Sequence, residues 1–414
     1  MNRLTTTIYH KSEELPELEG TNFFHSRQLF EICEQVPRLR PYMVVVTEES
    51  GRIVSHMLGV LRYRTFWLPP FLLVHCQVQG EGVYAESDYS HDELFGMMIN
   101  ALTQKQSNRT YYMEVSNLSH KMLGYKQLRQ NGFYPVNWVS IHNSLHSHSP
   151  EERISKKLQL RIDNAHTRGV VTEKVHNEED FTAFSKLLRR HNLFKPRRYM
   201  PDDLFFKKLM NGNDGDLFIT KYHGKVIGCS AVVYSEGNAY LWYSAFLRKT
   251  YLHLHPDILT IWDTIKDAHQ RGYQHICFMD VGLPYSKNPF REFILRFGGK
   301  EQSTYRWFRF SIKWVNKLLA WIYREWPASF SPALHHLLQF IVTGAHIDMP
   351  LLRYVRDGDQ FSLVHPILFT GCLLYLNGIC RRCDKLHCRI LLEAFILALH
   401  LVPPTAHKRH NQQS

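Results

Sequence analysis

The 414-residue sequence has little of what defines several special classes of protein. Eight cysteines are too few for a disulfide scaffold, and 22 glycines with 18 prolines exclude collagen-like and low-complexity chains. The first twenty residues contain no apolar run of the signal-peptide type, so export is not expected. With 44% hydrophobic residues, the composition predicts a globular chain of two or three domains in a reducing cytosol.

Familiar catalytic motifs are also missing. The sequence has no nucleophile elbow, Walker loop, HExxH motif or dinucleotide fingerprint, which removes the usual signals of hydrolases, NTPases, zinc proteases and Rossmann enzymes. Acidic residues are outnumbered, with 38 Asp and Glu against 50 Lys and Arg, for a net charge of +12. This balance favours an anionic partner, either nucleic acid or an anionic lipid surface.

Two stretches of the chain repeat one order of elements: hairpin, further strand, helix, strand, helix. We therefore predict an α/β (α+β) fold of two tandem domains, 1–145 and 146–312, followed by a helical extension, 313–414. Ser90 and Glu93 have capping-box spacing and predict a helix start. In the first domain the elements are expected at 22–35, 41–63, 71–84, 90–106, 110–117 and 119–133. In the second they are expected at 149–169, 170–175, 178–194, 216–246, 259–272 and 275–282.

Within the helical extension, one segment, 361–379, is long and apolar enough to be considered as a membrane span. This segment is nineteen residues long but contains His365, Pro366 and Asn377, so a buried helix explains it at least as well as a membrane span. The extension is therefore expected to be either a third helical layer or a membrane-facing appendage. Its cysteines and histidine, Cys380, Cys383, His387 and Cys388, are candidate zinc ligands, although structural zinc sites usually have a second, distant ligand pair.

A glycine string after the third predicted strand is a candidate cofactor loop. Gln77, Gly80 and Gly82 follow the pattern of a strand end that presents backbone N–H groups to a pyrophosphate, and the alternative is a purely structural strand end. The corresponding segment of the second domain, 248–255, contains no glycine, which disfavours a nucleotide cofactor there.

Basic residues gather in the second domain. Lys186 to Arg198 contains no acidic residue and interleaves cations with aromatic side chains, a pattern suited to tRNA or to a pyrophosphate-linked substrate; the alternative is a solvated helix face. Arg161 lies on the helix that opens the same domain. The candidate phosphate-binding residues are Arg161, Arg189, Arg190, Arg197 and Arg198.

A third candidate site follows the buried strand that ends at Met279. Asp280 comes at the end of this strand, where active sites of open α/β sheets form, and Lys287 lies in the loop beyond it. Asp280 could act as a base or orient Lys287, which could neutralise a developing oxyanion; in the alternative, Asp280 caps a turn and Lys287 is solvated. Tyr285 is added as a catalytic candidate, and Phe290 and Trp242 as substrate-binding residues.

Three stretches of the second domain resemble the GNAT superfamily, and within it the FemABX-like aminoacyltransferases. The stretch 154–175 looks like a family helix, 215–234 is similar to the GNAT hairpin, and 268–300 looks like the family's ending. The first domain is compatible, through 77–84 and a closing motif at 125–133. The residues that carry the likeness are Leu158, Arg161, Ile162, Ala165, Gly169, Val170, Gly272, Asp280, Gly282, Tyr285, Lys287, Phe290, Phe297, Gly298, Tyr125, Gly132 and Phe133.

The resemblance implies two GNAT-like domains and acyl or aminoacyl transfer to an amine or hydroxyl of a cell-envelope precursor or glycan. The donor would be aminoacyl-tRNA or acyl-CoA, with no tightly bound cofactor. Expected partners are a phosphate-bearing substrate or carrier, tRNA, and a membrane surface reached through the C-terminal tail, which predicts a cytoplasmic protein or one peripheral to the inner face of the membrane. The alternatives are an acetyl-CoA-dependent N-acetyltransferase and a non-catalytic basic scaffold.

Overall fold

The computed structural model of the chain describes residues 4–63, 74–116, 123–192, 199–279, 281–284 and 288–325. All of them belong to one unit, Met1–Asp348, and a second unit, Met349–Ser414, lies outside the described residues. The segment 361–379 and the four candidate zinc ligands are in this second unit. Within the described part of the chain, no helix is both long and apolar enough to cross a membrane.

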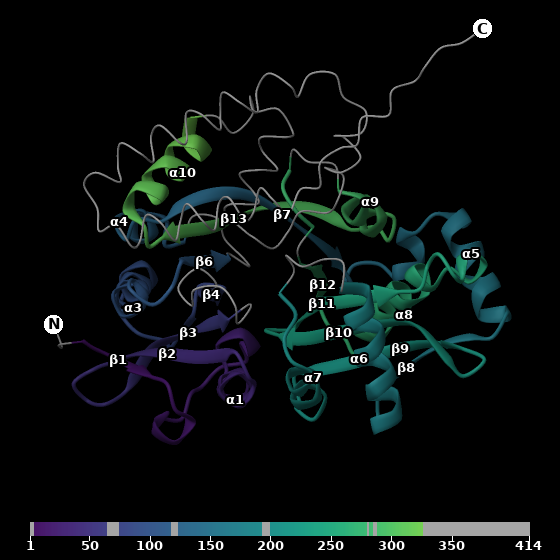
Figure 1. Ribbon diagram of the computed structural model, residues 1–414, viewed down its shortest axis with the longest axis horizontal. Coiled ribbons are helices and arrows are strands. Elements are labelled where there is room, and N and C mark those ends of the chain that lie inside the picture. Colours follow the sequence, from purple (N-terminus) through teal and green to yellow (C-terminus); the bar gives the residue numbers. More distant parts are fainter. Residues whose placement is uncertain are drawn as a thin grey trace, which may run out of the picture. The chain divides into compact units, whose positions relative to one another are not determined.

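The first half alternates strands with short helices, as its hydrophobic pattern predicts (Figure 1). The hairpin expected at 41–63 is β2–β3, whose strands pair antiparallel from Leu39 opposite Arg62 to Thr47 opposite Ile53. The elements are β1 (Thr5–Tyr9), α1 (Arg27–Gln35), β2 (Leu39–Thr47), β3 (Ile53–Tyr63), β4 (Val74–Gln79), β5 (Val83–Tyr84), α3 (His91–Gln106), β6 (Tyr112–Ser116), α4 (Tyr125–Gln130) and β7 (Tyr134–Ser144).

The second half repeats this order with longer strands. Its elements are α5 (Lys156–Thr167), β8 (Val170–Lys174), α6 (Glu178–Asn192), α7 (Asp203–Met210), β9 (Gly215–Tyr222), β10 (Lys225–Ser235), β11 (Asn238–Phe246), α8 (Pro256–Gln270), β12 (His275–Phe278), α9 (Pro289–Leu295) and β13 (Lys300–Phe310).

Two tight turns connect the strands of the β9–β10–β11 meander. His223 and Gly224 have φ values of 46° and 73°, and Glu236 and Gly237 have 50° and 74°. Two consecutive residues in the left-handed backbone conformation make a type I′ turn, whose twist matches that of the flanking strands. The strands on either side pair antiparallel, so the predicted hairpins are confirmed.

Duplication is visible in the strand pairing as well as in the order of elements. Each half contains one parallel pair, β4 with β6 and β11 with β12, joined through a crossover helix, α3 or α8. The other pairs are antiparallel. The predicted mixed α/β fold is therefore confirmed.

The two halves exchange their last strands. β13, at the end of the second half, lies between β6 and β7 of the first, and β7 in turn pairs with β12 of the second (Figure 1). One sheet therefore runs through both halves in the order β1-β2-β3-β4-β6-β13-β7-β12-β11-β10-β9-β8. The sheet is therefore continuous across the two predicted domains, 1–145 and 146–312.

A shared core also joins the halves. Phe30 of α1 is buried in the same cluster as Phe184 of α6 and Phe206 of α7, so helices from both halves meet over one side of the sheet. Separate clusters lie beneath α3 in the first half and beneath α8 in the second. The last described helix, α10 (Lys313–Glu325), packs Val315 and Leu319 against β7 and β13.

Candidate functional site

A β-bulge in β11 places two consecutive aromatic side chains on one face of the sheet. Leu241 pairs with Val232 and Tyr243 with Ala231, which leaves Trp242 as the extra residue. Ala239 and Leu241 face the core beneath α8, whereas Trp242, Tyr243 and Ala245 all face the core that joins the halves. Without the bulge, Tyr243 would point to the opposite face.

The parallel strands of the second half separate at the same point. β11 and β12 pair only as far as Leu241 and Phe278, while β11 continues to Phe246. In the first half, the pairing of β4 with β6 continues to the last residue, and the Gly80 N–H also donates to the Ser116 carbonyl at 2.8 Å. The sheet is thus open beside Trp242 and closed at the corresponding place in the first half.

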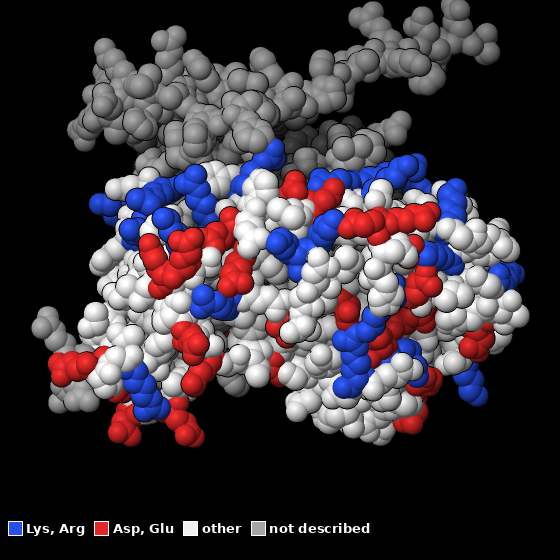
Figure 2. Space-filling view, turned by 90° about the horizontal axis from the view of Figure 1, so that it is seen from below, with Lys and Arg blue, Asp and Glu red and all other residues white. Residues whose placement is uncertain are grey.

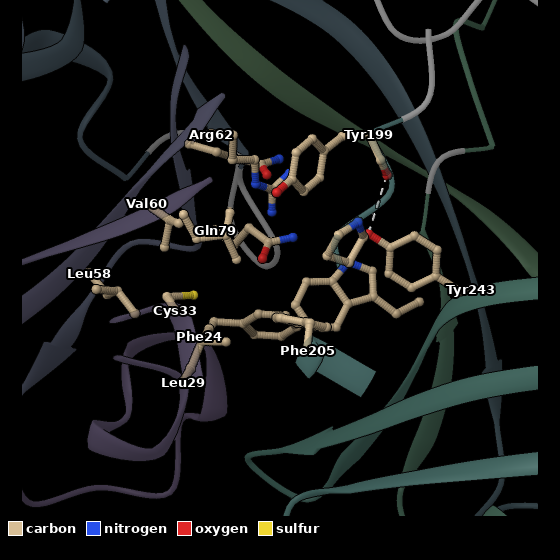
Figure 3. Close-up of a pocket in the computed structure, with 14 residues that line it drawn as sticks. Phe24, Leu29, Cys33, Leu58, Val60, Arg62, Gln79, Tyr199, Phe205 and Tyr243 are labelled. Atoms are coloured by element: carbon tan, nitrogen blue, oxygen red, sulfur yellow. Dashed lines mark hydrogen bonds between the residues drawn. The ribbon is translucent and has the colours of Figure 1, made fainter. Parts of the chain in front are cut away.

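A small pocket lies against this bulge (Figure 3). Both halves line it. The first half supplies residues from the segment before α1, from α1 itself and from β2, β3 and β4, and the second supplies residues around α7 and from β11. The lining residues are Phe24, Leu29, Cys33, Leu39, Leu58, Val60, Arg62, Gln77, Gln79, Tyr199, Pro201, Phe205, Trp242 and Tyr243.

One side of the pocket is polar. Arg62, Gln77 and Gln79 share one face of β3 and β4, because alternate residues of a strand point the same way. Figure 3 shows Arg62 beside the Tyr199 ring, and the guanidinium carbon lies 4.9 Å from the ring centre. Among the described residues, the Arg62 Nε and the Gln77 Oε1 are buried without a hydrogen-bond partner.

The other side of the pocket is apolar and aromatic. Phe24 and Phe205 pack edge-on against Trp242, with their ring centres 5.9 and 5.5 Å from the Trp242 ring centre, and Leu29 also lines the pocket. Burial raises the pKa of the Cys33 thiol to about 12 despite the nearby Arg62 charge, so Cys33 is protonated at neutral pH and is not a thiolate nucleophile. No lining residue among those described is a carboxylate or an imidazole.

A buried ion pair fixes one of the polar side chains. Glu114, on β6, accepts hydrogen bonds at Oε1 from Arg306 Nη1 and Ser116 Oγ, each at 3.1 Å, and from Gln77 Nε2 at 3.4 Å. Glu114 and Arg306 are both buried. Because the Gln77 amide donates to Glu114, its carbonyl oxygen remains available to the pocket.

The glycine loop is engaged by the protein itself. Gly80 and Gly82 have φ values of 95° and 103°, which glycine alone adopts readily. The Gly80 N–H donates to Ser116, and the Gly82 N–H is directed at His25 Nε2 at 3.1 Å. Gln77 lines the pocket, whereas Gly80 and Gly82 do not. These two N–H groups are not available to a pyrophosphate in this conformation.

The start of α8 gathers arginines. Charges of Arg161, Arg168 and Arg248 act on His255, the residue before the helix, and they contribute, after burial, to lowering its pKa. Arg248 is already paired with Asp257, at 3.4 Å, in the first helical turn. Arg161 has no ion-pair partner among the described residues. A cationic helix start of this kind attracts phosphate, and the phosphate-binding role of Arg161 stays a prediction.

The remaining predicted residues within the described part of the chain lie away from the pocket. Arg189 is paired with Asp203 at 2.8 Å, and Arg190 is exposed on α6. Phe290 packs against the core beneath α8. On the face shown in Figure 2, Lys and Arg alternate with Asp and Glu rather than forming one continuous basic surface.

Several predictions fall outside the described residues. These are the catalytic candidates Asp280, Tyr285 and Lys287, and the basic residues Arg197 and Arg198. Of the predicted set, Gln77 and Trp242 line the pocket. Sequence reasoning missed Arg62, Gln79 and Tyr199; the alternation of Gln77 and Gln79 with apolar Cys76 and Val78 was the available signal. In the described part of the chain, no group of three His, Cys, Asp or Glu residues could hold a metal ion.

Part of the second half matches a known protein family. Residues 153–287 match the family described as an acetyltransferase (GNAT) domain. A sequence search of curated proteins finds no match. The predicted resemblance to the GNAT superfamily is therefore confirmed over most of the second half. Because a GNAT domain transfers acyl groups, the prediction of an acyltransferase is confirmed as well.

Solved structures extend the likeness to both halves. The C-terminal domain of a protein named as a lysylphosphatidylglycerol synthetase, from Agrobacterium fabrum, is similar over 72% of this chain and 92% of that chain, with a TM-score of 0.50 and 9% identity. FemX is similar over 68% of this chain and 90% of that chain, with a TM-score of 0.48 and 11% identity. A tandem GNAT protein of clavulanic acid biosynthesis is similar over 75% of this chain and 99% of that chain, with a TM-score of 0.47 and 10% identity. At these identities the likeness concerns the fold alone.

Proposed function

Because residues 153–287 form a GNAT domain, we propose that the chain transfers an acyl or aminoacyl group to an amine or hydroxyl of a cell-envelope precursor or glycan. The observation that carries the proposal is the pocket between the halves, which lies against the bulged Trp242 where β11 separates from β12. Acceptor and donor can meet there with water excluded by the aromatic wall.

The donor in this proposal carries phosphate, as both aminoacyl-tRNA and acyl-CoA do. Arg161, Arg168 and Arg248 at the start of α8 are the residues that would hold it. The first half's glycine loop is a poorer place for acetyl-CoA, because its N–H groups donate within the protein. The name of the lysylphosphatidylglycerol synthetase neighbour favours an aminoacyl donor and a lipid-borne acceptor.

The chemistry requires little beyond positioning. The acceptor amine attacks the carbonyl carbon of the activated ester or thioester, a C–N bond forms, and the C–O or C–S bond breaks. The amine loses one proton and the departing alcohol or thiol gains one. On this proposal, alignment of an already nucleophilic amine against the activated ester supplies much of the rate acceleration. Asp280, Tyr285 and Lys287 remain the predicted catalytic residues.

The proposed partners follow from the same chemistry. A phosphate-bearing carrier or a tRNA would contact the basic start of α8, and a membrane surface would bring a lipid-linked acceptor to the pocket. On this proposal the protein works in the cytoplasm or at the inner face of the membrane.

A donor assay tests the proposal. The purified chain is incubated with labelled acetyl-CoA or labelled aminoacyl-tRNA and with extracted lipid-linked and nucleotide-linked precursors, and labelled amide or ester products are identified by mass spectrometry. We expect transfer from one of the donors, and at least a tenfold lower rate for Trp242→Ala. Val171→Ala, at an exposed position of β8, is the control and should keep the full rate. Consumption of neither donor would contradict the proposal.

A further inference from the structure

The polar side of the pocket holds a positive charge that the described residues do not neutralise. The Arg62 guanidinium makes no ion pair and no hydrogen bond with any described residue, and it lies over the Tyr199 ring. The segments next to these two residues in the sequence, 64–73 and 193–198, contain no Asp or Glu. A partly buried guanidinium without a counter-ion is costly, so an anionic ligand group at this position would gain an unusually strong hydrogen bond.

A fixed hydrogen-bond acceptor lies one strand away. Val60 pairs with Gln77 and Arg62 with His75, so Arg62 and Gln77 are diagonal neighbours on adjacent strands. The Gln77 amide is held by Glu114 through its N–H group, and its Oε1 is buried without a partner among the described residues. An N–H donor of a ligand would satisfy this oxygen.

Together the two side chains specify a ligand with two groups a short distance apart. We infer that the pocket binds an acyl acceptor that carries an amine close to an anionic group, with the anion on Arg62 and the amine N–H donating to Gln77 Oε1. This inference rests on the proposed function and names the class of acceptor. The anion is a carboxylate or a phosphate monoester, since either accepts from a guanidinium.

The rest of the pocket fits the apolar part of such a molecule. Leu58 lies on the same face of β3 as Arg62 and with Leu29 adds apolar surface to the pocket, and Phe24, Phe205 and Trp242 form the aromatic wall. The Tyr243 hydroxyl donates to the Tyr199 carbonyl at 3.5 Å, which ties β11 to the segment that stacks on Arg62 (Figure 3). The amine would therefore lie between Arg62 and the opening beside Trp242, on the side from which a donor must approach.

Small-molecule probes distinguish the Arg62 contact from the Gln77 contact, and a carboxylate from a phosphate. β-Alanine carries an amine and a carboxylate, and O-phosphoethanolamine carries an amine and a phosphate; propylamine and acetate carry one group each. Their dissociation constants are measured with the full chain by NMR titration, without any acyl donor. We expect at least one two-group probe to bind at least tenfold tighter than propylamine, and the tighter of the two identifies the anion.

Variants then assign each contact. Arg62→Gln should weaken the two-group probes about 10- to 100-fold, the range for a hydrogen bond to a charged group, and leave propylamine unchanged. Gln77→Leu should weaken every amine probe and leave acetate unchanged. Arg62→Lys keeps the charge and should retain part of the binding, which separates a lost contact from a misfolded chain. Arg129→Gln, exposed on α4, is the matched control.

Two outcomes would overturn the inference: unchanged probe binding in a folded Arg62→Gln variant, or a two-group probe that binds no tighter than propylamine. The test is independent of catalysis. Acyl transfer with unchanged probe binding would reject this inference and keep the proposed function. Arg62-dependent probe binding in a chain that transfers no acyl group would reject the proposed function and keep the assignment of the pocket to an anionic amine.

Discussion

Arg62 of the first half and Tyr199 of the second are in contact in the pocket wall, with the guanidinium carbon 4.9 Å from the ring centre. Burial raises the pKa of the Tyr199 hydroxyl, against the opposing effect of the Arg62 charge, so the phenol stays neutral at physiological pH. A neutral ring over a guanidinium is a cation–π contact, which stabilises by about 0.5–2 kcal/mol depending on desolvation. Here the contact joins the two halves.

We expect a double-mutant cycle of Arg62→Gln and Tyr199→Leu to give a coupling free energy of about 0.5–2 kcal/mol, because each single change removes the same contact. The measurement is the free energy of unfolding in urea for the four chains. As a control, Arg62→Gln is combined with Phe206→Leu, whose ring packs on Tyr243 outside the pocket lining. That pair should be additive within about 0.5 kcal/mol. Equal coupling in both cycles would contradict a specific contact.

The sequence predicts most of the secondary structure because local rules decide it. The turn residues Gly224 and Gly237 mark the hairpins, and Ser155 caps α5 by accepting from the Leu158 N–H. One local rule fails: α3 begins after Ser90 as predicted, but the Ser90 side chain makes no capping hydrogen bond. The strand β13 was also missed, because its position between β6 and β7 depends on pairing with residues more than 150 positions away.

The site is less predictable for the same reason. Trp242 and Gln77 stand out in the sequence, but nothing local shows that they line one pocket, since that depends on the packing of α1 against α7 across the halves. The bulge that turns Tyr243 inward is equally invisible, because it is a mismatch between two strands. Arg62 looks like an ordinary charged strand end until the structure places it in the pocket wall.

The buried ion pair beneath the pocket gives a prediction for stability. Glu114→Gln removes the carboxylate that pairs with the buried Arg306 guanidinium, and we expect the free energy of unfolding to fall by about 3–5 kcal/mol. The matched control is Glu31→Gln, which breaks the half-exposed pair of Arg27 with Glu31 and should cost less than about 1 kcal/mol. Urea denaturation measures both. Similar losses in the two variants would contradict a buried role for Glu114.

His25, whose ring contacts the Gly82 N–H of the glycine loop, predicts that the stability of the fold depends on pH. Burial, and to a smaller extent His56, lowers the pKa of His25 to about 3, from 6.5 in the unfolded chain. Below pH 6.5 the unfolded chain therefore binds a proton that the folded chain does not. The contribution of His25 is fully present above pH 6.5 and is lost as the pH falls toward 3, at up to about 1.4 kcal/mol per pH unit.

We expect His25→Asn to flatten the slope of the unfolding free energy between pH 6.5 and 4 by about 1.4 kcal/mol per unit. The slope that remains includes His56, because burial lowers its pKa to about 4. His148→Asn, at an exposed position, is the control and should keep the slope of the unaltered chain. The measurement is urea denaturation at half-unit pH steps. An unchanged slope in His25→Asn would show that His25 titrates normally in the folded chain.

The outer face of α10 carries an apolar stripe beside positive charge. Trp314, Leu318 and Trp321 are 39%, 46% and 50% exposed and follow one another at helical spacing, and Lys313 and Lys317 are exposed on the same helix. Tryptophan and leucine beside lysine are typical of helices that lie in the interface of an anionic bilayer. Each lysine near such a surface adds about 1 kcal/mol of attraction.

We therefore expect the full chain to co-sediment with phosphatidylglycerol vesicles and not with phosphatidylcholine vesicles, and to be released by salt. The double variant Trp314→Ser and Trp321→Ser should bind at least tenfold more weakly, because it removes the aromatic anchors and keeps the charge. Leu160→Ser is the matched control, since Leu160 is 61% exposed on a different helix, and it should bind like the unaltered chain. Full binding by the tryptophan variant would assign the lipid contact to another part of the chain and reject this role for α10.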